Sequence, residues 1–206
     1  MREILLATKN AGKLRELREI AGDLPVAWRG LADFPDLPDA DECGATFTEN
    51  ARLKALHYAR FTGLATLADD SGLEVDALTG VPGVHSARYA GTPRDDRANN
   101  RKLVQALAGV PLARRTARFR CALAFVRGGQ VVVETQGAFE GLIIDEPRGE
   151  NGFGYDPHFL VPDLGQTVAE LPAELKNARS HRGQAMRAML AELRRLYRTL
   201  GDQPTT

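Results

Sequence analysis

The sequence predicts an α/β protein with a mixed β-sheet. Helical and strand-like segments alternate in the first part of the chain, and two strand-like segments, residues 116–126 and 130–135, follow on either side of Gly128-Gly129. Alternation is typical of α/β folds, and a glycine pair between strands indicates a hairpin, so a sheet with parallel and antiparallel pairs is expected. The length of 206 residues favours one domain, with room for two lobes around a cleft.

The N-terminal part is predicted to contain one strand and two helices. Residues 3–7 form the expected strand, and a polar loop over residues 8–12 leads into an amphipathic helix that ends near Gly22. Residues 30–44 are rich in proline and aspartate and are predicted to be a loop. Thr46-Phe-Thr-Glu49 has the capping-box pattern, so a second helix is expected from there to about Phe61.

The rest of the chain supplies two more helices and two long loops. Residues 81–89 are loop-like, and Thr92-Pro93 is expected to start a helix that stops near Gly109, with the proline in its first turn. Residues 145–157 form a glycine-containing loop. The last helix is expected over residues 182–200, where methionines and leucines at helical spacing indicate a core-facing side.

Composition limits the classes of function. Hydrophobic residues make up 43% of the chain, and 27 basic residues balance 27 acidic ones. A strongly basic nucleic-acid surface and a membrane span are therefore not expected, although a small anionic ligand is compatible with zero net charge. Cys43 and Cys121 have no metal-ligand spacing, and the N-terminus has no signal-peptide pattern. These features predict a soluble cytoplasmic protein in a reducing compartment.

Two adjacent carboxylates, Asp69 and Asp70, follow an apolar run that begins at Leu64. The run is predicted to be a strand, and Ser71-Gly72 the turn that leaves it. Neighbouring carboxylates at a strand end repel each other and lose solvation, and a cation such as Mg²⁺, which prefers oxygen ligands, would relieve both costs. The alternative interpretation is a solvated Asp-Ser-Gly turn.

Two further segments could bind phosphate. Thr8, Asn10 and Lys13 surround the start of the first helix, where free backbone N–H groups and the helix dipole favour anions. The segment lacks the P-loop pattern, and a capped helix with an exposed lysine explains it equally well. Lys54 could hold phosphate or be a solvated helix lysine, and Glu42, in the loop before that helix, adds a third carboxylate.

Two segments near the C-terminus could bind a flat ring. Glycines flank Phe153 in Gly152-Phe-Gly-Tyr-Asp-Pro157, which permits a tight turn and an aromatic ring presented for stacking, or a turn with a core aromatic. Lys176 and Ser180-His-Arg182 offer hydrogen-bond donors suited to a carbonyl-bearing base. The alternatives are a helix N-cap for Ser180 and a surface position for His181.

Together these segments resemble the Ham1-like family of inosine and xanthosine triphosphate pyrophosphatases. The resemblance covers nearly the whole chain as one domain, residues 1–206, and it rests on six segments in order. These are Ala7-Thr-Lys-Asn-Ala-Gly-Lys13, Thr46-Phe-Thr-Glu-Asn50, Ala68-Asp-Asp-Ser-Gly-Leu73, Pro82-Gly-Val-His-Ser-Ala-Arg-Tyr-Ala-Gly91, Gly152-Phe-Gly-Tyr-Asp-Pro157 and Ser180-His-Arg-Gly183.

The resemblance implies a Mg²⁺-dependent enzyme that hydrolyses non-standard purine triphosphates (ITP, dITP and XTP) to the monophosphate and pyrophosphate, which cleanses the nucleotide pool. It also implies an elongated, twisted mixed sheet flanked by helices, with two lobes around a central nucleotide cleft, and a homodimer. The alternatives are a Maf-like pyrophosphatase acting on other modified nucleotides, or a nucleotide-binding regulator without catalysis. Nucleic-acid binding is the least favoured class.

The resemblance also implies roles for individual residues. Glu42 and Asp70 are expected to hold Mg²⁺, and Asp70 is the expected proton acceptor for the attacking water. Because metal binding lowers the basicity of a carboxylate, Asp69 is the alternative base. The expected substrate contacts are Thr8, Asn10, Lys13, Lys54, Ser71, Phe153, Gly154, Tyr155, Asp156, Lys176, His181 and Arg182.

Overall fold

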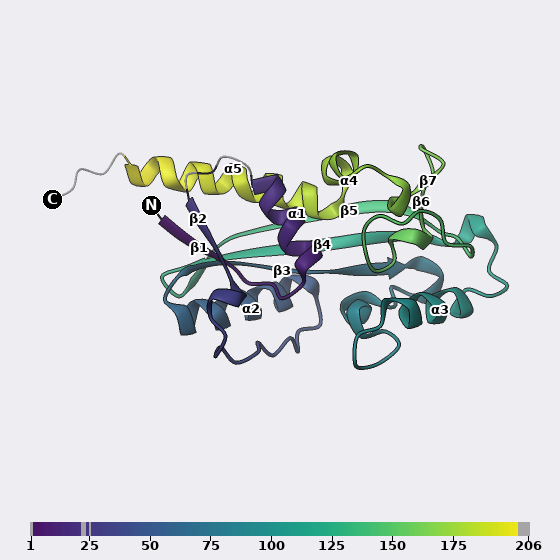
Figure 1. Cartoon of the computed structure of the whole chain (residues 1–206), viewed down its shortest axis with the longest axis horizontal. Coiled ribbons are helices and arrows are strands. Elements are labelled where there is room, and N and C mark those ends of the chain that lie inside the picture. Colours follow the sequence, from purple (N-terminus) through teal and green to yellow (C-terminus); the bar gives the residue numbers. More distant parts are fainter. Residues whose placement is uncertain (1, 22–23, 25, 202–206) are drawn as a thin grey trace. The chain divides into compact units, whose positions relative to one another are not determined.

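The computed structural model describes residues 2–21, 24 and 26–201 and contains one mixed sheet of strand order β2-β1-β3-β4-β5-β6-β7 (Figure 1). The strands are β1 (Arg2–Leu6), β2 (Val26–Gly30), β3 (Ala65–Val75), β4 (Thr116–Arg127), β5 (Gln130–Ile143), β6 (Phe159–Val161) and β7 (Gln166–Thr167). The helices are α1 (Ala11–Ala21), α2 (Phe47–Thr62), α3 (Asp96–Ala106), α4 (Ala173–Arg179) and α5 (His181–Gly201). Strand β1 pairs in parallel with β2 and β3, whereas β6 pairs antiparallel with β5 and β7, so the predicted mixed sheet is confirmed.

The chain divides into two compact units. Unit 1 comprises residues 1–70, 122–136 and 182–206, and unit 2 comprises residues 71–121 and 137–181. Residues 1 and 202–206, which end the expected domain, lie outside the described part of the chain. Within that part, no helix combines the length and the apolar character that a membrane crossing requires.

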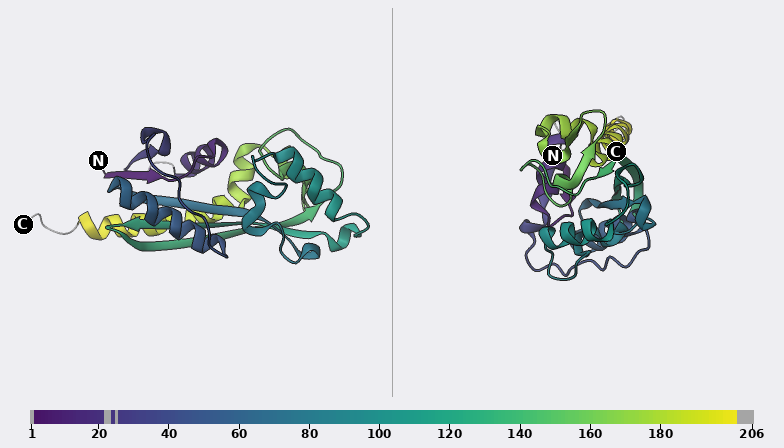
Figure 2. Two further views of the ribbon diagram at one scale, coloured as in Figure 1. Left: turned by 90° about the horizontal axis from the view of Figure 1, so that it is seen from below. Right: turned by 90° about the vertical axis from the view of Figure 1, so that its right-hand side faces the viewer.

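Unit 1 has helices on both faces of its strands. Residues 122–126 of β4 are all buried in succession, which requires cover on both sides of the strand. Figures 1 and 2 show α2 on one side, with α1 and α5 on the other. The capping box of α2 is present: Thr46 Oγ1 accepts from the Glu49 N–H at 3.1 Å, and Glu49 Oε2 accepts from the Thr46 N–H at 3.2 Å. Met186, Met189 and Leu193 of α5 are buried, as predicted.

Unit 2 is built around a core of aromatic and aliphatic side chains. Phe119 of β4 stacks on Phe159 of β6 with ring centroids 4.3 Å apart, and Phe139 of β5 lies against Phe159 at 5.8 Å. In Figure 1, α3 lies on one side of the strands of this unit and α4 on the other. The two strands β4 and β5 are joined through Gly128 and Gly129, whose φ values of 58° and 74° are those of a two-residue hairpin turn.

Two predicted element boundaries were wrong. Ser71-Gly72 is not a turn, because β3 continues to Val75 and buries Leu73 and Val75 completely in the core of unit 2. Helix α3 does not start at Thr92-Pro93. It starts at Asp96, because the Asp95 side chain accepts from the Ala98 N–H at 3.0 Å and so caps the helix there.

Other differences concern short elements and element ends. The sequence patterns missed β2, β6, β7 and α4, whose two to seven residues are too few for a clear period. Strand β5 runs eight residues past its expected end at Thr135, to Ile143, and residues 83–88 form a 3₁₀ helix within the expected loop. Helix α1 ends at Ala21, and the predicted end near Gly22 lies outside the described residues.

Candidate active site

The start of α1 is a turn closed by side-chain hydrogen bonds. Asn10 Oδ1 accepts from the Lys13 N–H at 3.1 Å and caps the helix, and Thr8 Oγ1 accepts from the Asn10 N–H at 3.3 Å. The predicted cap is therefore present. Lys13 is not an exposed lysine, because its Nζ lies 2.7 Å from Asp69 Oδ2 and only 15% of its side chain is exposed.

Lys54 of α2 is buried among oxygen atoms. Its Nζ donates to the Asp69 carbonyl oxygen at 2.9 Å and lies 2.9 Å from Glu42 Oε2. Burial lowers the pKa of Lys54, but the charges of Asp69, Glu42 and Asp70 outweigh it and hold the pKa above its ordinary value. Lys54 is therefore a buried, permanently charged group, and the solvated-lysine interpretation is wrong.

The two adjacent aspartates have different environments. Burial raises the pKa of Asp69, but Lys13, Lys54 and Arg182 together lower it to about 2. For Asp70 burial is also the largest effect, and here it prevails over Lys54 and Lys13, so the pKa of Asp70 lies above its usual value. Asp69 thus keeps its charge and serves to hold lysines, whereas Asp70 binds a proton more readily.

Two supporting residues were not identified as site residues from the sequence. Asn50, one helical turn before Lys54 on α2, donates from Nδ2 to Asp70 Oδ2 at 3.0 Å and accepts from the Gly44 N–H at 2.8 Å. Glu16, one turn after Lys13 on α1, is buried and bonds to Arg182 Nη1. Spacing of one turn from a predicted phosphate lysine was the available signal in both cases.

A metal could be held here only with help from other ligands. Among the described residues, no three His, Cys, Asp or Glu side chains gather so as to hold a metal ion. Glu42 lies 2.9 Å from Lys54, and the charge of Asp70 also acts on this lysine. Two carboxylates are a donor set that suits Mg²⁺, which usually keeps waters and takes phosphate oxygens of a substrate. The residues present therefore fit a metal that arrives with a polyphosphate.

In unit 2, the loop that follows Gly152 wraps around one carboxylate. Asp156 Oδ2 accepts from the Phe153 N–H at 2.9 Å and from Lys176 Nζ at 2.8 Å. Gly152 has φ +78°, and a Cβ there would lie 2.0 Å from Asp156 Oδ2, so only glycine fits. Phe153 is half-buried and has Lys176 Nζ 4.8 Å from its ring centroid. Phe153 is therefore not a core aromatic, and part of it can contact a ligand.

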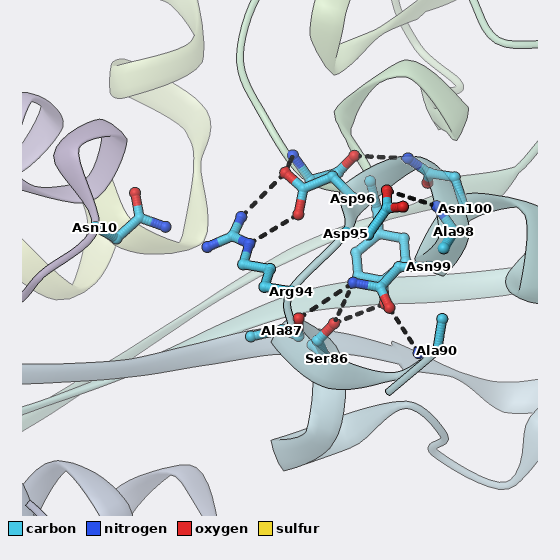
Figure 3. Close-up of polar contacts among 12 residues, drawn as sticks. Asn10, Ser86, Ala87, Ala90, Arg94, Asp95, Asp96, Ala98, Asn99 and Asn100 are labelled. Atoms are coloured by element: carbon cyan, nitrogen blue, oxygen red, sulfur yellow. Dashed lines mark hydrogen bonds and ion pairs between the residues drawn. The ribbon is translucent and has the colours of Figure 1, made fainter. Parts of the chain in front are cut away.

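The other predicted residues of this loop serve its framework. Tyr155 is buried in the core of unit 2 and donates from its hydroxyl to the Ser86 carbonyl oxygen at 2.8 Å, and burial raises its pKa. The Gly154 backbone bonds to side chains of α3, the region drawn in Figure 3. Ser71, half-buried, is the first residue of unit 2 on β3.

The donors at the start of α5 are buried and already engaged. His181 is 6% exposed and stacks on Phe119 with centroids 5.0 Å apart, so it is not a surface histidine. Arg182 is 2% exposed and belongs to unit 1 with Glu16. Ser180 ends α4 as its C-terminal cap residue, directly before α5.

The predicted residues therefore form two sets. In unit 1, Lys13, Lys54, Asp69, Asp70 and Glu42 are brought together at the start of α1 and along α2. In unit 2, an aromatic ring is presented beside a buried ion pair, Lys176 with Asp156. Buried cations at a helix N-terminus can bind phosphates, and a half-exposed ring can stack on a base.

Similar proteins identify the family of this chain. The profile of the Ham1 family matches residues 4–192. The chain is 50% identical over 195 residues to a dITP/XTP pyrophosphatase of Desulforamulus reducens, covering 95% of this chain and 97% of that protein, and 53% identical over 186 residues to one of Geobacter sulfurreducens, covering 90% and 94%.

Solved structures agree with the sequence relatives. A HAM1 protein from Coxiella burnetii superposes with a TM-score of 0.87 at 44% identity, covering 95% of this chain and all of that one. A nucleoside-triphosphatase / dITP/XTP pyrophosphatase from Mycobacterium abscessus gives a TM-score of 0.75 at 44% identity, covering 91% and 98%. The chain therefore belongs to the Ham1 family.

Proposed function

We propose that this protein hydrolyses non-standard purine nucleoside triphosphates (ITP, dITP and XTP) to the monophosphate and pyrophosphate. One observation carries the proposal: Lys54, Asp69 and Asp70 of unit 1 are buried, and the half-buried Lys13 in the first turn of α1 contacts Asp69 at 2.7 Å. Buried cations with acidic partners suit a polyphosphate and its metal. The names of the relatives, dITP/XTP pyrophosphatase, support the choice of substrate.

The triphosphate binds at the start of α1. Lys13 and Lys54 supply charge, while Thr8 and Asn10 hold the turn that exposes the helix amides. Both lysines are paired with carboxylates in the free protein, so a bound triphosphate shares or replaces these contacts without moving the lysines far. Such preorganised charge is the main contribution a protein makes to phosphoryl transfer.

Hydrolysis joins a water oxygen to the α-phosphorus and breaks the bond that leads to the β-phosphate. Glu42 and Asp70 would hold Mg²⁺, which when bound would neutralise charge on the phosphates. Asp70 accepts the proton of the attacking water, and Asp69 keeps Lys13 and Lys54 in place. Asp69 is the alternative base, although its pKa of about 2 makes it the weaker proton acceptor.

The base is recognised by the residues that the sequence predicted for it. Phe153 stacks on it, Gly154, Tyr155 and Asp156 frame the ring, and Ser71 adds a hydrogen bond. Lys176, His181 and Arg182 present donors to the oxygen at position six of hypoxanthine or xanthine. Adenine has an amino group there, and each unmatched polar pair costs about 1–3 kcal/mol.

Both units serve one catalytic domain, because the family match from residue 4 to residue 192 runs through both. The enzyme acts in the cytoplasm as a homodimer on a small nucleotide, without a nucleic-acid partner. The zero net charge supports the expectation that nucleic acid is not the substrate.

The test is pyrophosphate release from a panel of ITP, dITP, XTP, the standard triphosphates and other modified nucleotides, with Mg²⁺ and with chelator. We expect pyrophosphate from the first three and little from ATP. Release of orthophosphate would exclude the proposed bond cleavage. Preference for other modified nucleotides would favour a Maf-like activity, and ITP binding without turnover would favour a regulator.

A further inference from the structure

Both backbone polar groups of Gly154, its N–H and its C=O, are hydrogen-bonded to side chains of one helix. Asp96 Oδ2 accepts from the Gly154 N–H at 3.0 Å, and Asn100 Nδ2 donates to the Gly154 carbonyl oxygen at 2.8 Å. Asp96 and Asn100 are one turn apart in the first half of α3, so they face the same side of the helix. All three residues belong to unit 2.

The start of α3 is itself fixed, which makes it a suitable support. Arg94 binds both carboxylate oxygens of Asp96, at 2.8 and 3.0 Å, as Figure 3 shows. Asn99 lies between Asp96 and Asn100 in the sequence and is buried. It accepts from the Ala90 N–H at 2.7 Å and donates to the Ala87 carbonyl oxygen at 3.2 Å. Burial raises the pKa of Asp96, but the hydrogen bonds and charge of Arg94 together with the Gly154 N–H outweigh it and hold the pKa below its ordinary value.

Hydrogen bonds rather than packing locate Gly154. Its φ is +65°, and a Cβ built at this position would have no atom within 4 Å. On its N-terminal side, the Phe153 N–H is bound by Asp156, and on its C-terminal side Tyr155 is anchored in the core. The half-buried ring of Phe153 is thus attached to a segment whose position depends on Asp96 and Asn100.

Asn100 carries a feature that a purely structural role does not explain. Its Oδ1 is buried and has no hydrogen-bond partner in the described part of the chain, while its Nδ2 bonds to Gly154. A buried acceptor without a partner lowers stability, whereas an apolar side chain of similar size would avoid that loss. A residue kept at such a disadvantage is typical of a site where geometry serves function.

We propose that Asp96 and Asn100 are positioning residues that clamp the Gly154 peptide and so set the orientation of Phe153 for contact with the base. The inference rests on the proposed function, because it concerns base binding by the same enzyme. It adds two specificity-determining residues on α3 that touch neither phosphate nor base. Their effect is expected on KM for the preferred base and not on the chemical step.

The experiment is a double-mutant cycle in the full-length protein. Asn100→Leu and Asp96→Ala are each combined with Phe153→Ala, and Gln105→Ala, at an exposed position of the same helix, is the matched control. Asn100→Leu is expected to raise KM for ITP about five-fold, the size of one lost hydrogen bond, with kcat changed by less than about two-fold. In the Phe153→Ala background the same substitution should change KM by less than about two-fold.

Two further readouts separate positioning from general damage. Amide exchange at residues 152–156 in the free protein should be faster in Asn100→Leu and Asp96→Ala and unchanged in Gln105→Ala. Asp96→Asn keeps an acceptor oxygen and should restore most of the affinity that Asp96→Ala loses. Asn100→Leu should not lower the melting temperature, since it also removes the buried oxygen that has no partner.

The possible results distinguish a failure of the inference from a failure of the proposed function. Additive effects of Asn100→Leu and Phe153→Ala on KM, in an active wild type, overturn the inference and leave the proposed function intact. Faster exchange without a change in KM has the same meaning. A wild type that releases no pyrophosphate from any triphosphate overturns the proposed function, and the inference with it.

Discussion

The candidate residues of unit 1 and unit 2 are held in place by different means. In unit 1, charged side chains mainly fix one another: Lys13 lies 2.7 Å from the Asp69 carboxylate, and Lys54 lies 2.9 Å from that of Glu42. In unit 2, the loop around Phe153 is held mainly through its backbone N–H and C=O groups. In the proposed function, the charged side chains bind the phosphates that all triphosphates share, and the ring contacts the base, which differs between them.

Variants of the two units should therefore differ in how they change activity on different triphosphates. Changes in the charged set of unit 1 should affect every triphosphate alike, because each one carries the same phosphates. Changes in the loop of unit 2 should alter the preference between bases. A variant of either unit that behaves like the other would break the division, and the largest effect is expected in unit 1.

Asp70→Asn should reduce turnover at least about 1,000-fold on ITP and ATP alike, since it removes the proposed proton acceptor and metal ligand. Because burial raises the pKa of Asp70, its charge is unfavourable in the folded protein, so the neutral variant should be no less stable in urea unfolding. Steady-state pyrophosphate release measures the first effect.

Asp69→Asn, at the neighbouring residue, is the matched control for Asp70→Asn. A smaller loss of turnover than in Asp70→Asn supports Asp70 as the base, and a larger loss reverses the assignment. Near-normal turnover of Asp70→Asn would remove the proposed role altogether.

The two sets also differ in how far the sequence predicted them. Residue type and position made Lys13, Asp69 and Asp70 candidates, with an exposed lysine and a solvated turn as alternatives, and the resemblance to the Ham1 family favoured the site. The sequence could not show that β3 continues past Asp70, since only the burial of Leu73 and Val75 in a distant core explains it.

In unit 2 the predicted ring was found, but its supports were not. Phe153 and its glycines form a local pattern that sequence can show. Asp96 and Asn100 lie more than 50 residues away along the chain and look like ordinary helix-surface residues. The same limit explains Glu16, whose partner Arg182 is 166 residues distant.

The buried ion pairs allow a second comparison between the units. Glu16 with Arg182 in unit 1 and Asp156 with Lys176 in unit 2 are both nearly excluded from solvent. Truncation of one partner leaves a buried carboxylate without that cation, so Arg182→Ala and Lys176→Ala should each lower the free energy of unfolding by about 3–5 kcal/mol. Urea unfolding checks this.

Because both variants are destabilised, the preference between ITP and ATP must be measured under conditions in which Arg182→Ala and Lys176→Ala are still folded. If Arg182 contacts the base, Arg182→Ala should also lower the ratio of kcat/KM for ITP to that for ATP. Adding Glu16→Gln should recover stability without recovering the ratio. An unchanged ratio in the folded variant would contradict base recognition by Arg182.

The smallest expected effect concerns acid stability and contrasts Asp69 with Asp96. Lys13, Lys54 and Arg182 lower the pKa of Asp69 to about 2, against an ordinary 3.8. The folded protein therefore binds fewer protons than the unfolded chain between these values, and Asp69 contributes stability that is present above pH 3.8 and lost as the pH falls through about 2. The difference corresponds to about 2 kcal/mol. Urea unfolding of wild type and Asp69→Asn from pH 6 down to pH 2 should show the difference between their free energies of unfolding shrinking by that amount.

The pKa of Asp96 is also lowered, through Arg94 and the Gly154 N–H, but Asp96 is partly exposed. Asp96→Asn should therefore show a weaker trend of the same sign. An equal or stronger trend for Asp96 would mean that charge holds the unit 2 loop as firmly as it holds the unit 1 site.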